Sequence, residues 1–296
     1  MMKIVLLGKN GQVGWELQRA LLPLGQLISL DRHNGGDLAN PEELTKTIRT
    51  IKPDVIVNAA AYTAVDKAEE DIALATIINA EAPALLATEC ASSGSLLIHY
   101  STDYVFDGSG NTPRLESDVT APLNCYGRTK LTGEQAIQAS GCQHLIFRTS
   151  WVYGKSGNNF IKTIMRLARE KEMLSVIDDQ IGAPTGADLL ADITAHIIRS
   201  SVQNSHQSGI YHLTASGETS WYNYACYLVE TARELGELLN VKAVNPIPSC
   251  DYKTAALRPL NSRMDTSKLS NQYSLHLPHW HVGVARILRE ILGKNS

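Results

Sequence analysis

The sequence predicts an α/β protein with a doubly wound parallel sheet, on two observations. Short apolar strands alternate with helical segments through the first half of the chain, which is the order of consecutive βαβ units. A glycine-rich stretch, "GKNGQVG", joins the first of these strands to the first helix. The second observation narrows the expectation to a Rossmann-type sheet, because such a turn is typical of dinucleotide-binding folds.

The first half supplies the strands and helices of this sheet in order. Apolar runs rich in β-branched residues predict strands at 3–8, 26–31, 54–60, 95–106 and 144–154. Helical spacing of apolar residues predicts helices at 12–25, 40–53, 70–94 and 126–140. The helix at 40–53 has Asn40 as its cap and Pro41 at its first position. The strand at 54–60 is almost unbroken in its apolar character, which predicts burial on both faces of the sheet.

The pattern is looser after about residue 155. Helices are expected at 158–172, 186–201, 219–236 and 280–293, the third capped by Thr219 or Ser220, with one strand at 209–215. We expect a dinucleotide-binding domain over 1–150, to which later segments return. Residues 151–296 then form mainly a smaller, interleaved C-terminal substrate-binding region.

Composition excludes several classes of function. The chain has 296 residues and a net charge of −3, with no basic patch or tail, so nucleic acid is not an expected partner. Neither a signal peptide nor an apolar run of membrane-spanning length is visible, so no membrane association is expected. The five cysteines are odd in number and scattered, which fits reduced thiols in a cytoplasm.

The glycine-rich stretch carries Gly8, Gly11 and Gly14 between a strand and a helix. Glycine lets the backbone turn tightly and approach a pyrophosphate, and the helix N-terminus presents free N–H groups to it. The spacing Gly-x-x-Gly-x-x-Gly departs from the usual Gly-x-Gly-x-x-Gly, but its strand–turn–helix setting is the one that a dinucleotide requires.

Asp31 ends the second predicted strand, where an acid typically bonds the adenosine ribose. Alone it favours NADH, because a carboxylate repels a 2′-phosphate, whereas the following Arg32 would attract one. We therefore expect both NADH and NADPH to be used. Asp37 and Leu38 are a second candidate contact, to the adenine. The alternative for Asp31 is an ordinary surface acid.

Candidate catalytic residues lie where strands end. Thr102 follows the fourth strand, and Tyr126 and Lys130 lie four positions apart at the start of the next helix, which puts them on one face. Reduction of a ketone by hydride leaves an alkoxide, which a tyrosine can protonate if a nearby ammonium lowers the tyrosine pKa. A threonine hydroxyl can orient the carbonyl. The alternative is two unrelated surface residues on a helix.

Six motifs in order resemble the dTDP-4-dehydrorhamnose reductase family of the extended short-chain dehydrogenase/reductase superfamily. They are "GKNGQVGWELQ", "VNAAAYTAVDKAE", "STDYVFDG", "PLNCYGRTKLTGE", "RTSWVYG" and "GAPTGADLLAD", and together they cover nearly the whole chain. The resemblance implies NAD(P)H-dependent reduction of the C4 ketone of dTDP-4-dehydro-β-L-rhamnose to dTDP-L-rhamnose. This is the last step of dTDP-rhamnose synthesis, in a bacterial cytoplasm and in the service of surface polysaccharides such as lipopolysaccharide O-antigen.

The resemblance also assigns residues. The catalytic set falls on Thr102, Tyr126 and Lys130, with Lys130 holding the nicotinamide ribose as well. Sugar contacts fall on Thr102, Asp103 and Trp151. Within this mechanism Arg258 and Arg263 of "LRPLNSRMD" are candidates for the diphosphate, with ordinary surface positions as the alternative. Cofactor contacts fall on the glycine turn and the strand ends, at Gly8, Gly11, Gln12, Val13, Asp31, Asp37, Leu38, Ala61, Tyr62, Thr63, Tyr100, Tyr126 and Lys130.

Other parts of the resemblance concern assembly and metal. The family includes homodimers that bridge Mg²⁺ with acids, for which Glu16, Asp188 and Glu290 match here, although Asp188 is shorter than the family's glutamates. Surface charges are the alternative. The histidines of "HLPHWH" at 276–281 match no zinc pattern.

Two other functions stay open on sequence alone. A sugar-nucleotide dehydratase or epimerase shares the expected fold, but dehydratases show Asp-Glu after the threonine, and here Tyr104 follows Asp103. A non-catalytic regulatory subunit of the methionine adenosyltransferase type also resembles the family. The presence of all three catalytic residues argues against it.

Overall fold

The computed structural model describes residues 1–203 and 208–294 and is organised around a parallel sheet. Six strands lie in the order β2-β1-β3-β4-β5-β10, and every neighbouring pair is parallel. The strands are β1 (Lys3–Leu7), β2 (Gln26–Leu30), β3 (Val55–Asn58), β4 (Leu96–Thr102), β5 (His144–Thr149) and β10 (Gly209–His212). The predicted doubly wound sheet is thus confirmed, and the chain reverses its direction of growth between β1 and β3.

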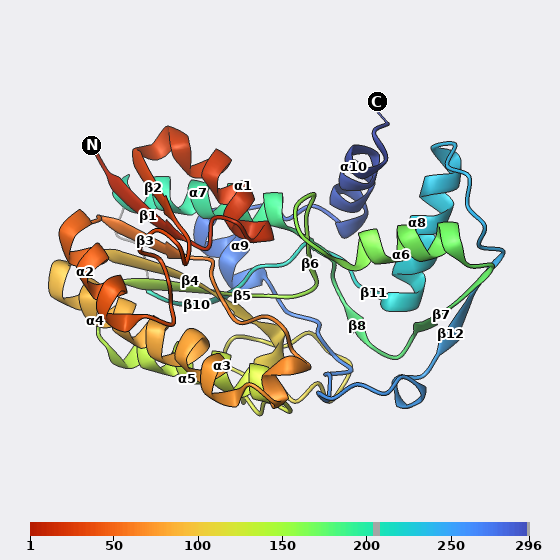
Figure 1. Ribbon diagram of the computed structural model, residues 1–296, viewed down its shortest axis with the longest axis horizontal. Helices are drawn as coiled ribbons and strands as arrows, with labels where there is room; N and C mark the ends of the chain where they lie inside the picture. Colours follow the sequence, from red (N-terminus) through yellow and green to blue (C-terminus); the bar gives the residue numbers. More distant parts are fainter. Residues whose placement is uncertain (204–207, 295–296) are drawn as a thin grey trace.

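Helices cover both faces of this sheet (Figure 1). One face is buried under α1 (Gln12–Leu21), α7 (Ala187–Gln203) and α9 (Ser267–Tyr273). The opposite face is buried under α2 (Pro41–Ile51), α4 (Ala82–Ser93) and α5 (Cys125–Ala139). Three segments from beyond residue 151, α7, α9 and β10, therefore complete the sheet and its cover, as the expected interleaving requires.

The region predicted as one helix over 70–94 consists of three consecutive segments. They are α3 (Ile72–Thr76), a π-helical turn (Ile77–Glu81) and α4. The run from Ile72 to Ser93 is long and apolar enough to cross a membrane by length and composition alone. Its residues Leu86, Ala87 and Cys90 are instead packed into the core beneath the sheet, as in a core helix of a globular protein.

The second region lies to one side of the sheet, on the right of Figure 1. Its core joins α6 (Phe160–Glu170), α8 (Trp221–Glu234) and α10 (Trp280–Leu292) with the parallel pair β7 (Met173–Ile177) and β12 (Ala243–Ile247). Short two-residue pairs connect it to the sheet, β6 (Val152–Tyr153) with β9 (Thr185–Gly186) and β8 (Ile181–Gly182) with β11 (Thr219–Ser220).

Several predicted boundaries differ from the structure. The strand expected over 144–154 stops at Thr149 and restarts as β6, because Trp151 adopts a left-handed backbone with φ of +48°. The strand expected over 95–106 ends at Thr102, where a short 3-10 helix begins. The strands β7 and β12 and the helix α9 were not predicted. The caps at Asn40 and Ser220 were, and both side chains accept a backbone N–H there.

Candidate active site

A cavity of about 700 Å³ opens at the carboxyl ends of β1, β3, β4 and β5. Open α/β sheets bind their ligands at this edge, next to the point where the strand order reverses. The expected site residues that line it are Gly8, Gly11, Gln12, Val13, Ala61, Thr63, Tyr100, Thr102, Asp103, Tyr126, Lys130 and Trp151. Those that do not line it are Glu16, Asp31, Asp37, Leu38, Tyr62, Asp188, Arg258, Arg263 and Glu290.

The glycine turn is shaped for close approach of the backbone. Gly8 has φ of +85°, and a Cβ placed on it would lie 2.7 Å from the amide nitrogen of Ala60. A Cβ on Gly14 would lie 2.0 Å from the carbonyl oxygen of Gly8. Gly11 caps α1 without a side-chain acceptor, so the first N–H groups of the helix have no cap to satisfy them. This cradle fits a dinucleotide pyrophosphate.

Asp31 is already bonded by neighbouring protein donors. Its Oδ2 accepts from Asn10 Nδ2 at 2.8 Å and lies 3.3 Å from Lys9 Nζ. Its Oδ1 accepts from the backbone N–H of His33 at 2.9 Å, and this bond is the main reason why the pKa of the carboxyl is lowered. Lys9, which sequence analysis missed, therefore brings a cation beside Asp31, in addition to Arg32 one residue further on.

Asp37 and Leu38 lie outside the cavity. The Oδ1 of Asp37 accepts from the backbone N–H of Ala39 at 3.0 Å, and Leu38 is buried in the core beneath α2. A contact of these two residues with adenine stays a prediction.

The segment 61–63 that follows β3 is held by Asn79, a residue that sequence analysis missed. The backbone N–H of Tyr62 donates to Asn79 Oδ1 at 2.9 Å, and Asn79 Nδ2 donates to the Tyr62 carbonyl at 3.1 Å. Asn79 lies in the π-helical turn, which interrupts a stretch that had looked like one regular helix. The Tyr62 hydroxyl donates to Asp71 at 2.8 Å, so its side chain is engaged away from the cavity.

Thr102 and Tyr126 meet at the end of β4. The Thr102 hydroxyl donates to Asp103 Oδ1 at 3.1 Å and accepts from the backbone N–H of Tyr104 at 3.2 Å. Tyr126 is the second residue of α5, whose N-terminus is capped by Asn124. Burial raises the pKa of Tyr126, and a hydrogen bond with the Thr102 hydroxyl lowers it in part.

Lys130 lies one turn further along α5 and is buried. Its ammonium donates to the Tyr100 carbonyl oxygen at 2.5 Å and lies 3.0 Å from His99 Nε2. Burial lowers the pKa of Lys130 to about 8, against an opposing effect of Glu134. The Tyr100 hydroxyl bonds Thr194 at 2.6 Å in the core under α7, so Tyr100 offers the cavity its backbone.

The expected effect of Lys130 on Tyr126 differs from what the described side chains produce. The groups that act on the Tyr126 pKa are Thr102, which lowers it, and Asp103 and Tyr104, which raise it, all of them outweighed by burial. The Lys130 ammonium is directed at β4, so the protein alone leaves Tyr126 a protonated phenol.

Asp103 is a buried carboxyl that lines the cavity. Burial raises its pKa to about 6, while the hydroxyls of Ser262 and Thr102 lower it in part. Two further buried hydroxyls in this part of the structure, those of Ser101 and Thr149, have no hydrogen-bond partner among the described residues. Both residues line the cavity, which leaves polar atoms available to a ligand.

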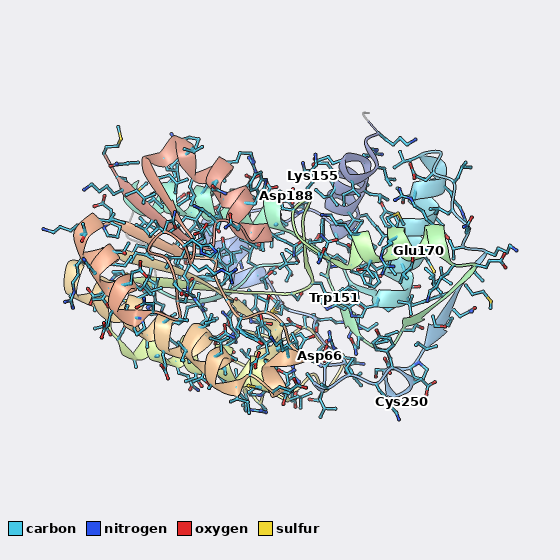
Figure 2. The ribbon with its side chains drawn as sticks, in the orientation of Figure 1. Asp66, Trp151, Lys155, Glu170, Asp188 and Cys250 are labelled. Atoms are coloured by element: carbon cyan, nitrogen blue, oxygen red, sulfur yellow. The ribbon has the colours of Figure 1, made fainter. Side chains whose placement is uncertain are left out.

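Trp151 stands at the junction of the two regions, above Asp66 in Figure 2. Its ring stacks on that of Trp221, with centroids 3.6 Å apart and planes inclined by 14°. The ring also lies close to Gly182, where a Cβ would be 2.9 Å from it. Sequence analysis missed Trp221, because no local pattern predicts that two tryptophans 70 residues apart in the chain will stack.

A second cavity of about 920 Å³ shares Trp221 with the first. It lies between α6, β7 and the segment 252–258, and Phe160 and Lys253 are among the residues that line it. Arg258, a candidate for the diphosphate, also lines it and pairs with Asp66 at 2.6 Å, which ties the second region to the sheet.

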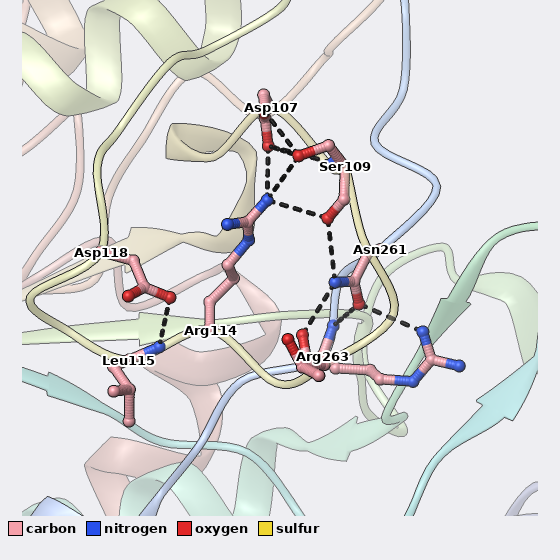
Figure 3. A network of polar contacts seen from close by, with 8 residues as sticks. Asp107, Ser109, Arg114, Leu115, Asp118, Asn261 and Arg263 are labelled. Carbon is pink, nitrogen blue, oxygen red and sulfur yellow. Dashed lines mark hydrogen bonds and ion pairs between the residues drawn. The ribbon is translucent and has the colours of Figure 1, made fainter.

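Arg263, the other arginine expected at the diphosphate, lies elsewhere. Its guanidinium pairs with Glu218 at 2.6 Å and donates to Asn261 Oδ1 at 3.2 Å. Figure 3 shows it in a polar network that continues through Asn261 toward Arg114 and Asp107. Arg263 lines neither of the two cavities, so the structure supports only Arg258 in that role.

The three acids expected to bind magnesium are bonded to arginines. Arg286 pairs with Asp188 and, at 2.7 Å, with Glu290, and Arg19 lies 3.5 Å from Glu16. Over residues 1–203 and 208–294, no three acids, histidines or cysteines form a group that could hold a metal ion. The residues in this arrangement do not fit Mg²⁺ within one chain, since Asp188 and Glu290 both bond the Arg286 guanidinium and Glu16 lies beside Arg19.

Comparisons with known proteins agree with this geometry. The family model described as "RmlD substrate binding domain" matches residues 2–292. A dTDP-4-dehydrorhamnose reductase of Escherichia coli (strain K12) is 55% identical over 293 residues, 98% of each chain. Solved structures of dTDP-4-dehydrorhamnose reductases from Clostridium acetobutylicum and, in complex with NADP, Bacillus anthracis are each 34% identical. Both have a TM-score of 0.90, covering 98% of this chain and 100% of theirs.

Proposed function

The chain belongs to the dTDP-4-dehydrorhamnose reductase family of NADP-dependent oxidoreductases, and we propose that it reduces the C4 ketone of dTDP-4-dehydro-β-L-rhamnose to dTDP-L-rhamnose. The observation that carries this proposal is the meeting of Thr102, Tyr126 and Lys130 in the cavity that the glycine turn also lines. A binding subunit would have no need of this combination.

The glycine turn, the segment 59–61 and Lys130 are the groups that would hold a nicotinamide nucleotide. The space over Gly8 and the uncapped start of α1 suit its pyrophosphate. The bound nucleotide supplies hydride to the keto carbon. Asn79 keeps the next segment in place through its paired bonds to Tyr62.

Tyr126 is the proton donor to the C4 oxygen. Its raised pKa keeps the phenol protonated at neutral pH, so the proton is present when negative charge develops on that oxygen. The Thr102 hydroxyl, which donates to Asp103 in this structure, would turn its proton to the carbonyl oxygen and so orient the ketone. The Lys130 ammonium, one helical turn away, is directed at β4 and would hold the nicotinamide ribose.

The two joined cavities divide the substrate between them. The deoxy sugar lies beside Asp103, with its apolar face on Trp151, and the nucleotide extends past Trp221 into the second cavity. There Arg258 and Lys253 are the cations for the diphosphate, and Phe160 is an aromatic face for the base. Arg258 would exchange Asp66 for the diphosphate on binding.

Lys9 and Arg32 set the cofactor preference. The Asp31 carboxylate already accepts hydrogen bonds from Asn10 and His33 and pairs with Lys9. It therefore discriminates weakly between a 2′-hydroxyl and a 2′-phosphate. We expect Lys9→Ala to raise the KM for NADPH roughly tenfold while the KM for NADH changes little, since charge-assisted bonds contribute about 1.5–3 kcal/mol. An equal change for both cofactors would contradict this role.

The setting of the enzyme is the remaining part of the proposal. All five cysteines are free in the part of the chain that the structure describes, which fits a reducing bacterial cytoplasm. A homodimer stays a prediction. A Mg²⁺ bridge is not part of the proposal, because it would require a second copy to turn the acids away from Arg19 and Arg286.

Oxidation of NADPH and NADH with enzymatically generated dTDP-4-dehydrorhamnose tests the function. The parent protein should oxidise the cofactor in proportion to dTDP-rhamnose formed, and Tyr126→Phe should reduce kcat by roughly 10²–10⁴-fold. Tyr104→Phe is the matched control, since the centroid of the Tyr104 ring lies 5.6 Å from that of Tyr126. This variant should retain most of the activity. No oxidation by the folded parent protein would reject the proposal.

A further inference from the structure

Lys130 is the first of three buried polar side chains in a row, and the proposed chemistry does not use the other two, His99 and Asn58. Asn58, His99 and Lys130 are each 1% exposed. Lys130 Nζ is 3.0 Å from His99 Nε2, and His99 Nδ1 is 3.2 Å from Asn58 Nδ2. An imidazole in such a place is costly unless both of its nitrogens are bonded.

The pairing of strands β3 and β4 places these side chains in a row. Asn58 is the last residue of β3 and pairs in register with His99 on β4. Lys130 reaches the same point from α5, where it also bonds the carbonyl of Tyr100. Beyond Asn58 the chain enters the segment 59–61, which lines the candidate cofactor cavity. The row therefore connects Lys130 with a wall of that cavity.

A neutral imidazole has one donor and one acceptor nitrogen, so its tautomer depends on its partners. If Lys130 is charged, it donates to Nε2, and Nδ1–H must donate to the Asn58 amide oxygen. If Lys130 is neutral, Nε2–H can donate to the amine, and Nδ1 accepts from the Asn58 NH₂ group. In that second arrangement the Asn58 oxygen is free for the Ala60 N–H, with which it is bonded at 3.2 Å.

We propose that His99 is a positioning residue for Lys130, and that its tautomer follows the charge of Lys130 and turns the Asn58 amide toward or away from Ala60. The proposal deepens the proposed reductase function, since it concerns the lysine of that site. The conformation of the segment 59–61 would then depend on whether Lys130 carries a proton. The effect passes through His99 on β4 and Asn58 on β3.

The charged groups around the row indicate that Lys130, and not His99, is the group that titrates. Besides Lys130 itself, Glu134 on α5 acts on Lys130, and Glu134 is held by Arg148 of β5 at 2.6 Å. Burial and the charge of Lys130 hold the pKa of His99 well below its ordinary value, so His99 stays neutral. Burial lowers the pKa of Lys130 to about 8, so the tautomer should change in that pH range.

Nitrogen-15 NMR of histidine-labelled protein without cofactor tests the switch directly. The His99 signals are identified as those missing from His99→Gln. They should show a proton on Nδ1 below about pH 8 and on Nε2 above it, and Lys130→Met should hold a single tautomer throughout. One tautomer over the whole pH range in the parent protein would overturn the proposal, as would a switch that persists in Lys130→Met.

The dependence of kcat/KM on pH is a second readout, and a purely structural role of His99 would not shift it. His99→Phe removes an acceptor of the ammonium, so the alkaline limb of the kcat/KM profile should shift down by about one pH unit, a tenfold change in the protonation equilibrium. His99→Gln, whose side-chain oxygen can replace Nε2, should restore the limb. An unshifted limb in folded His99→Phe, or no restoration in His99→Gln, would reject the role.

The matched control is His144 on β5, also buried, whose Nδ1 is 2.9 Å from the Cys142 carbonyl oxygen. His144→Phe should leave the limb in place, and an equal shift there would mean general loss of packing. The NMR experiment requires no activity. A tautomer switch without keto-sugar reduction would therefore reject the proposed function and keep this inference.

Discussion

The sheet region and the second region use their residues differently. In the sheet, the turn after β1, the segment after β3 and the end of β4 each place a short stretch of sequence at one edge. In the second region, the wall of the cavities is made by contacts between distant segments, such as the stack of Trp151 on Trp221. Backbone geometry therefore shapes the proposed cofactor side of the site, and side-chain packing shapes the proposed substrate side.

Glycine substitutions in the two regions would sharpen this contrast most strongly. In Gly14→Ala the new Cβ would lie 2.0 Å from a backbone oxygen of the turn, so α1 must move. We expect NADPH affinity to fall, and kcat/KM to fall roughly 100-fold, since misplacement of reacting groups by about 1 Å lowers the rate by that much. In Gly182→Ala the Cβ would meet the Trp151 ring, so we expect the KM of the sugar nucleotide to rise and NADPH affinity to stay unchanged. Fluorescence titration with NADPH would show whether the two variants separate in this way, and equal losses would contradict it.

The buried carboxyl of Asp103 should make the stability of the sheet region depend on pH. Its pKa is raised to about 6 in the folded protein, so the folded state retains a proton that the unfolded chain loses near pH 4. The free energy of unfolding should therefore fall as pH rises from about 4 to 6, by roughly 2–3 kcal/mol.

Asp103→Asn carries no ionisable group and should remove this fall, which urea unfolding at several pH values would measure. It should also weaken binding of the sugar. Parallel pH dependences of the variant and the parent protein would show that Asp103 is not the group responsible.

Trp221→Leu tests the substrate side through a single ring that lines both cavities. Loss of the stack with Trp151 should raise the KM of the sugar nucleotide about tenfold, since an aromatic pair contributes about 0.5–1.5 kcal/mol beyond burial. NADPH affinity should not change. Trp15→Leu is the control, because Trp15 is exposed on α1 and lines neither cavity. A rise in the NADPH KM of Trp221→Leu would mean that the two sides of the site are not separate.

The smallest effect is expected from a chelator. Because Arg286 already pairs with Asp188 and Glu290, removal of divalent cations should leave the melting temperature, the gel-filtration volume and the activity unchanged. A chelator that splits a dimer or lowers the melting temperature would instead support a magnesium ion shared between two copies.

Sequence reasoning was most successful where function follows from position along a strand. The strands, the glycine turn and Tyr126 with Lys130 are local patterns, and the structure brings these residues to one cavity. It failed where the effect depends on surroundings. The ammonium of Lys130 turns to β4, and burial raises the Tyr126 pKa, which four-residue spacing on a helix cannot reveal.

Asn79, Lys9 and His99 were missed for the same reason. Asn79 acts from a π-helical turn inside an apparently regular helix, Lys9 reaches Asp31 across the turn between β1 and α1, and His99 is hidden in an apolar strand. None has a signature in its own neighbourhood. Each is defined by the group that it bonds.

The sequence by itself determined the sheet, the cofactor turn and the type of chemistry, because strand alternation, glycine and tyrosine–lysine spacing act over a few residues. Only the tertiary structure decided that Arg258 and not Arg263 reaches the second cavity, that Trp221 joins the two cavities, and that the expected magnesium ligands hold arginines. These outcomes depend on which distant side chains meet, and such meetings are fixed by packing of the whole chain.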